Sequence, residues 1–227
     1  MLFLTRSLGS VDDVALISSK YLTGKYGDPD WFGPVKSLLE KSYAAVLDSL
    51  NDKSRLPYHP SIYLIPFMLS RKYKIGHDLV SSFFYSLSYP DATDFSKYST
   101  YIVASLAEKF PQHMTGIIAH EIAHIIAAKG EVKITEEDLL LILKNRIEFL
   151  KAKETIAEHY YSYFSEPVSS SIKKWNEMAL LPETEREVSE KMIIVDQKQF
   201  DALIFEERLP QFREFVRTKL ENIKTSF

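Results

Sequence analysis

The stretch from Ile117 to Ile126 constrains the fold more than any other part of the sequence, because it is apolar except at three positions. His120, Glu121 and His124 stand among residues that are all isoleucine or alanine. On an α-helix, residues four positions apart lie about 40° apart around the axis, so the two histidines share one face. The stretch therefore predicts a buried helix that presents two imidazoles and a carboxylate close together.

The His-Glu-x-x-His spacing suits the binding of one metal ion by both imidazoles. Glu121 follows His120 directly, which places it beside such a metal without making it a natural ligand, and it could polarise a bound water. The alternative is a helix whose two histidines are satisfied by hydrogen bonds and whose glutamate is solvated. The apolar surroundings of the three polar residues favour the metal site.

A catalytic zinc site normally has three protein ligands, so a third residue is needed. Glu154 is the first candidate, because it lies on the next predicted helix in a stripe of aliphatic residues, where an unpaired carboxylate would be costly. The aliphatic members of that stripe are Leu140, Leu143, Ile147 and Leu150. The alternative is that the helix has reached solvent by this point. Glu158, one turn later, could accept the free N–H of a ligating histidine. His159 ranks second as the third ligand, and Glu158 ranks third.

The composition excludes several classes of protein. Of the 227 residues, 45% are hydrophobic and 26% are charged, which is typical of a globular chain, and we expect one domain spanning residues 1–227. The absence of cysteine excludes disulfide frameworks, thiol nucleophiles and iron–sulfur clusters. A net charge of −3 without a basic stripe argues against a nucleic-acid partner. No apolar run reaches the roughly 18 residues of a membrane span, so we expect a soluble, cytoplasmic protein without a membrane partner.

A small antiparallel or mixed sheet is predicted from three segments that are rich in aromatic and β-branched residues. These segments are residues 62–65, 83–85 and 101–103. Pro66 predicts a strand end or an edge strand. The third segment also fits a helix, because residues 104–107 suit either state. Segment 101–103 could bind an extended substrate by edge pairing.

N-terminal helices are predicted before these strands. Ser10 can cap a short helix, and residues 24–33 form a predicted loop. Pro34 suits the first position of a longer helix, whose apolar stripe reaches Leu50.

Helical patterns also dominate after the strands. Pro111 opens the helix with the two histidines, and Thr135 caps a second helix that runs to about Phe164. Residues 167–171 are predicted as a loop, and a final amphipathic helix runs through residues 212–223. The chain is therefore predicted to be α+β, with a small sheet packed on the histidine helix and on the following glutamate-bearing helix.

The two motifs together resemble those of the gluzincin branch of zinc metallopeptidases. The chain is most similar to the small, single-domain minigluzincins of that branch. The resemblance covers roughly residues 100–165, including the order of strand, histidine helix and glutamate helix. The residues that carry it are His120, Glu121, His124, Glu154, Ala157 and Glu158.

This resemblance implies a zincin-like fold and a zinc-dependent hydrolysis of peptide bonds in a peptide or protein substrate. It implies that His120, His124 and Glu154 bind Zn²⁺ and that Glu121 is the general base. Glu158 stands where family members often have an aspartate that supports a ligand histidine.

Two other functions fit the same residues. One is a catalytically inactive zincin-like module for binding or regulation, in which the metal is structural. The other is a protease with a single protein target. Replacing Glu121 by glutamine would distinguish the first from a peptidase. Tyr160, Tyr161 and His159 are candidates for stabilising an oxyanion, and none of them is assigned that role.

Overall fold

The protein is described by a computed structural model with both helices and strands, which confirms the α+β class and the mixed sheet. The structure describes residues 24–56, 58–75, 78–90, 97–128, 160–179, 181–189, 193–196 and 198–200. The predicted helix after Ser10, the predicted helix from Thr135 up to residue 159, and the predicted C-terminal helix lie outside these ranges.

Helix α2 (Pro29–Ser49) begins earlier than predicted. The side chain of Asp28 accepts a hydrogen bond from the backbone N–H of Asp30, which caps the helix and leaves Pro29 in its first turn. Pro34 therefore lies inside the helix rather than at its start. The prediction chose the wrong proline, because an aspartate immediately before a proline is the stronger start signal.

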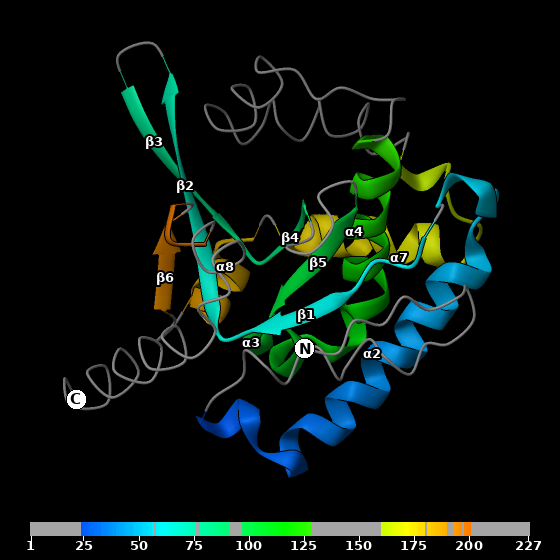
Figure 1. Cartoon of the computed structure of the whole chain (residues 1–227), viewed down its shortest axis with the longest axis horizontal. Helices are drawn as coiled ribbons and strands as arrows, with labels where there is room; N and C mark the ends of the chain where they lie inside the picture. The colour runs from blue at the N-terminus through cyan, green and yellow to red at the C-terminus, as the bar shows by residue number, and fades with distance from the viewer. Residues whose placement is uncertain are drawn as a thin grey trace.

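The first of two three-stranded sheets has the order β1-β5-β4. Strand β1 (Ile62–Ile65) runs parallel to β5 (Tyr98–Val103), and β4 (Ser86–Pro90) pairs with β5 in the antiparallel sense (Figure 1). Strand β5 is the central strand, because it is paired on both sides. Segment 101–103 is thus not an edge, which removes the predicted pairing of substrate with it.

The second sheet has the order β3-β2-β6 and is built on a long hairpin. Strand β2 (Phe67–Ile75) is antiparallel to β3 (Asp78–Phe84) and parallel to β6 (Ile193–Asp196). In Figure 1 this hairpin extends away from the helices, at the upper left. Only Pro66 separates β1 from β2, which confirms the strand end predicted at that proline.

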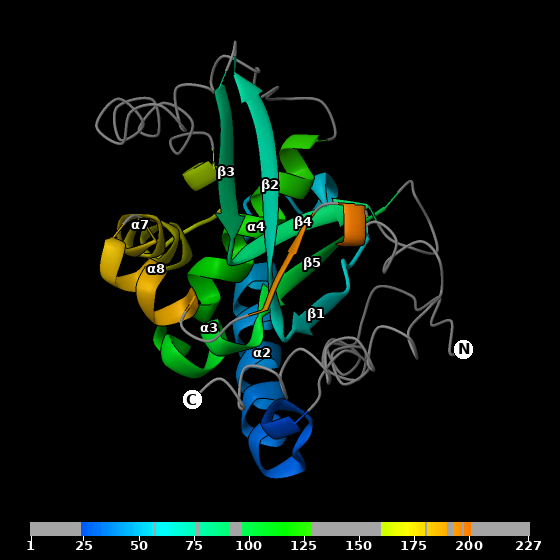
Figure 2. The ribbon, with the colours of Figure 1, turned by 90° about the vertical axis from the view of Figure 1, so that its left-hand side faces the viewer.

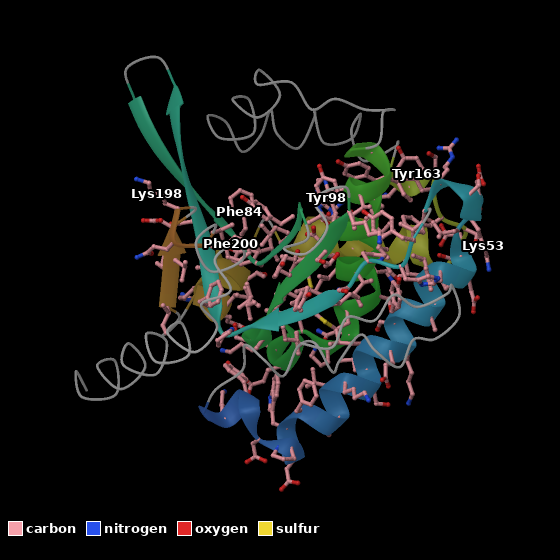
Figure 3. The ribbon with its side chains drawn as sticks, in the orientation of Figure 1. Lys53, Phe84, Tyr98, Tyr163, Lys198 and Phe200 are labelled. Atoms are coloured by element: carbon pink, nitrogen blue, oxygen red, sulfur yellow. The ribbon has the colours of Figure 1, made fainter. Side chains whose placement is uncertain are left out.

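Phe200 joins the two sheets. Its ring lies 6.1 Å from that of Phe67 on β2, and 5.2 Å from both Tyr89 on β4 and Tyr101 on β5. Figure 3 labels Phe200 in the region of β2. These edge-on contacts are the preferred geometry of aromatic pairs. The chain following β6 therefore returns to close the core between the sheets.

The helix with the two histidines is α4 (Met114–Ala128), and it follows α3 (Ala104–Lys109) and the 3₁₀ turn η4 (Pro111–His113). Residues 104–107, left open between strand and helix, are helical. Helix α4 packs against α2, α7 and β4. Figure 2 shows it between α7 and the strands. The prediction of a buried histidine helix is confirmed.

Helix α7 (Val168–Met178) occupies most of the predicted loop 167–171. Serines in that segment suggested a turn, but they lie in the first turn of the helix, where such residues are well tolerated. Hydrogen bonds from Ser169 and Ser170 to the Glu166 carboxylate hold the pKa of Glu166 below its usual value. Helix α8 (Pro182–Ser189) follows. None of the described helices is both long and apolar enough to span a membrane.

Candidate metal centre

His120 and His124 lie one turn apart on α4, and their rings meet edge to face. The Nε2 atoms of the two rings are 3.0 Å apart, and the ring centroids are 4.7 Å apart. Ile122 and Ala123, which lie between the histidines, and Ile125, which follows them, are fully buried. The local helix geometry therefore places both imidazoles at one point, as their spacing predicts.

The distance between the two Nε2 atoms suits two nitrogens that bind the same metal ion. Two nitrogens that each bind one tetrahedral zinc at about 2.0–2.1 Å lie about 3.3 Å from each other. The observed 3.0 Å is close to that value. The same distance also suits an N–H···N hydrogen bond between two neutral rings, which is the alternative considered from the sequence. The donor set and its spacing therefore suit zinc without requiring the helix to move.

Burial keeps His124 in the form that a metal needs. It lowers the pKa of His124 to about 4, so the ring is neutral at neutral pH. A neutral imidazole has one nitrogen with a free lone pair for a metal.

Tyr160 contacts the His124 ring at its second nitrogen. Its hydroxyl oxygen lies 3.0 Å from His124 Nδ1, on the side of the ring away from the Nε2 atom that faces His120. Burial, more than the neighbouring charges of Glu121 and Tyr163, raises the pKa of Tyr160 above its usual value, so the hydroxyl stays protonated. Such a contact to the outer nitrogen orients a ligand histidine. The hydroxyl oxygen can accept the Nδ1–H of the tautomer whose Nε2 lone pair is free for a metal.

The role of Tyr160 was missed in the sequence, where it was considered only as an oxyanion donor. The two residues are 36 positions apart, and no local pattern brings them together. Tyr161, the other tyrosine considered, forms a hydrogen bond with Asn176 on α7 instead. An outer partner for a ligand histidine was predicted at Glu158, which lies outside the described residues.

Glu121 is 2% exposed, and two serines of β4 contact its carboxylate. Ser86 Oγ donates to Oε1 at 2.6 Å, and Ser88 Oγ lies 3.0 Å from Oε2 and 2.8 Å from the Glu121 carbonyl oxygen. Burial raises the pKa of Glu121 to about 7, and the serine hydrogen bonds oppose this rise. The sequence predicted neither serine, because no motif includes them.

The structure brings His120 and His124 together, and it places Glu121 on the same helix with its carboxylate against β4. Glu154, Glu158 and His159 lie outside the described residues, so the third ligand remains a prediction. Within the described part of the chain, no group of three or more His, Cys, Asp or Glu side chains is placed to hold a metal ion.

No protein-family model matches this sequence, and comparison with curated proteins and with solved structures finds no significant match.

Proposed function

We propose that this protein is a zinc-dependent peptidase in which His120 and His124 bind the metal and Glu121 is the general base. The 3.0 Å separation of the two Nε2 atoms is the observation that carries the proposal. It is supported by the neutral state of His124 and by the place of Glu121, next to His120 on the same buried helix.

The residues that would hold zinc are the two histidines through Nε2, with Glu154 as the third ligand inferred from the sequence. Zinc bound there would supply a Lewis acid that polarises a peptide carbonyl and lowers the pKa of water. Tyr160 would keep the His124 ring turned toward the metal through its contact with Nδ1.

Glu121 would carry the proton through the reaction. Its carboxylate would accept a proton from water while the water oxygen forms a bond to the peptide carbonyl carbon. The same carboxyl would then give that proton to the amide nitrogen as the carbon–nitrogen bond breaks. The products are a carboxylic acid and an amine, and no further reactant is needed.

The edge of β4 is the place where we propose that an extended peptide substrate pairs. Strand β4 pairs with β5 on one side, and no described strand pairs with its other side. Main-chain hydrogen bonds to such an edge bind a peptide without regard to its side chains. Because Ser86 and Ser88 of β4 contact Glu121, a peptide bound there would lie near the base.

A second candidate function is a non-catalytic module with a structural metal. The 2% exposure of Glu121 favours it, because a general base must be reached by water. In that case Glu121 would serve only to join α4 to β4.

One experiment separates these functions. Zinc content and cleavage of an unbiased peptide library are measured for the wild type, Glu121→Gln and Glu154→Ala. A peptidase predicts about one zinc per chain in the wild type, with metal retained but turnover lost in Glu121→Gln. Loss of zinc in Glu154→Ala would support Glu154 as the third ligand. Zinc-loaded wild type that cleaves no peptide would favour the structural metal, and a wild type that binds no zinc would overturn both.

A further inference from the structure

Two serines on β4 make contact with the Glu121 carboxylate from one side of the strand. Ser86 and Ser88 are two positions apart, and alternate residues of a strand point to the same face. Their places are set by pairing with the central strand, where Ser86 lies opposite Ile102 and Ser88 opposite Thr100. The contact therefore joins two elements whose relative position is set by the core, not by a loop.

The two serines make different bonds. Ser86 Oγ has one acceptor, Glu121 Oε1, at a short 2.6 Å. Ser88 Oγ lies within reach of two acceptors, the Glu121 carbonyl oxygen at 2.8 Å and Oε2 at 3.0 Å. A hydroxyl has a single proton to donate, so Ser88 divides its bond between the main chain and the side chain. Ser86 therefore holds the carboxylate through an undivided hydroxyl bond. Ser88 also donates its backbone N–H to the carboxylate, and its hydroxyl joins β4 to the backbone of α4.

We propose that Ser86 is a positioning residue for the general base, which fixes the orientation of the Glu121 carboxylate, and that Ser88 assists it. This inference rests on the proposed peptidase function. A carboxylate has about four lone-pair sites. The two serine hydroxyls and the backbone N–H of Ser88 occupy three of them, which leaves one able to accept a proton. In a site excluded from solvent, an oxygen that loses its donor is costly, and the carboxylate would rotate to find another partner.

The test compares Ser86→Ala with three other variants. Ser86→Thr keeps the hydroxyl and suits a strand. Ser88→Ala removes the Ser88 hydroxyl but keeps the bond from its backbone N–H to the Glu121 carboxylate. Ser105→Ala is the matched control, because the buried Ser105 donates to the Val188 carbonyl oxygen at 3.3 Å and does not contact Glu121. Each variant is measured for zinc content, kcat, KM and the crystallographic position of the Glu121 carboxylate.

We expect Ser86→Ala to keep its zinc and its KM while kcat falls about tenfold, the effect of losing one hydrogen bond to a charged group. Ser86→Thr should restore most of kcat, and Ser88→Ala should lower kcat less than Ser86→Ala does. The control should retain wild-type kcat. In crystals of Ser86→Ala, the Glu121 carboxylate should be displaced from its wild-type position.

The crystallographic measurement separates this inference from the proposed function. A displaced carboxylate in Ser86→Ala, together with zinc-loaded wild type that cleaves no peptide, would support the positioning by Ser86 and overturn the peptidase. An undisplaced carboxylate would overturn the positioning role whatever the activity. A fall in kcat that Ser86→Thr does not reverse, or that Ser105→Ala matches, would also overturn it.

Discussion

The Nε2 atoms of His120 and His124 lie 3.0 Å apart on one face of a helix whose other faces are buried. Burying two imidazole rings on a core helix costs free energy unless their nitrogens bind a hydrogen-bond partner or a metal. A shared metal would satisfy both Nε2 atoms at once, and the helix already holds them close to the required separation.

Replacing His124 by alanine should abolish stoichiometric zinc binding. Because the residue is a proposed ligand, the loss of affinity should exceed the 10–100-fold that loss of an outer hydrogen-bond partner typically costs. His113→Ala is the control, since the His113 ring lies 6.2 Å from the Trp175 ring and outside the histidine pair. Metal analysis after dialysis checks this. Equal zinc content in the two variants would contradict the site.

Tyr160→Phe should weaken zinc binding by about tenfold while leaving the fold intact. The change keeps the ring but removes the hydroxyl that lies 3.0 Å from His124 Nδ1. Tyr43→Phe is a closely matched control, because the Tyr43 hydroxyl lies 3.0 Å from Nδ1 of His59, away from the site. Competition with a zinc-binding dye measures both affinities. A similar fall in the two variants would mean that Tyr160 has no specific role.

The stability of chelator-treated protein should depend on pH through Glu121. Burial raises its pKa from 4.5 to about 7, so between these values the folded state binds a proton that the unfolded state does not. This contribution to stability is complete below pH 4.5 and is lost as the pH rises through 7. It amounts to about 3 kcal/mol.

The wild type must be compared with Glu121→Gln, because the pKa shift of His124 changes the free energy of unfolding with pH in the opposite direction. Its pKa is lowered from 6.5 to about 4, so its contribution grows with pH across the same interval. Urea unfolding of the wild type and of Glu121→Gln at a series of pH values cancels the His124 effect. The difference between the two proteins should change steadily from pH 4.5 to 7, and a constant difference would contradict the prediction.

Gly116→Ala should destabilise the protein by about 1–3 kcal/mol, the usual cost of overpacking. A Cβ atom at this position of α4 would collide with the carbonyl oxygen of Ser171 and lie 3.1 Å from the Trp175 Cβ atom on α7. Backbone cannot move aside as a flexible side chain can, so the two helices would have to separate.

Gly33→Ala on α2 is the control for this packing prediction. Nothing lies within 4 Å of a Cβ atom there. The better helix propensity of alanine is opposed by the restriction that Pro34 places on the residue before it, so the change should stay below about 1 kcal/mol. Thermal unfolding measures both variants, and equal destabilisation would show that the close approach of α4 and α7 is not the cause.

Features that depend only on neighbouring residues could be predicted from the amino-acid sequence. The approach of His120 to His124 follows from helix geometry over four residues, and the burial of their helix follows from the isoleucines and alanines around them. The strand end at Pro66 follows from the missing N–H of proline. Each of these predictions was local, and each is confirmed.

The other features depend on contacts between segments that are far apart in the sequence. The division of the strands between two sheets and the parallel pairing of β1 with β5 depend on contacts between distant segments. The partners of the site residues do as well, because Ser86 lies 35 positions from Glu121, and Tyr160 lies 36 positions from His124. A serine or tyrosine has no local signature for such a role. Only the packing of α4 against β4 and against the segment at Tyr160 places these hydroxyls beside the carboxylate and the imidazole.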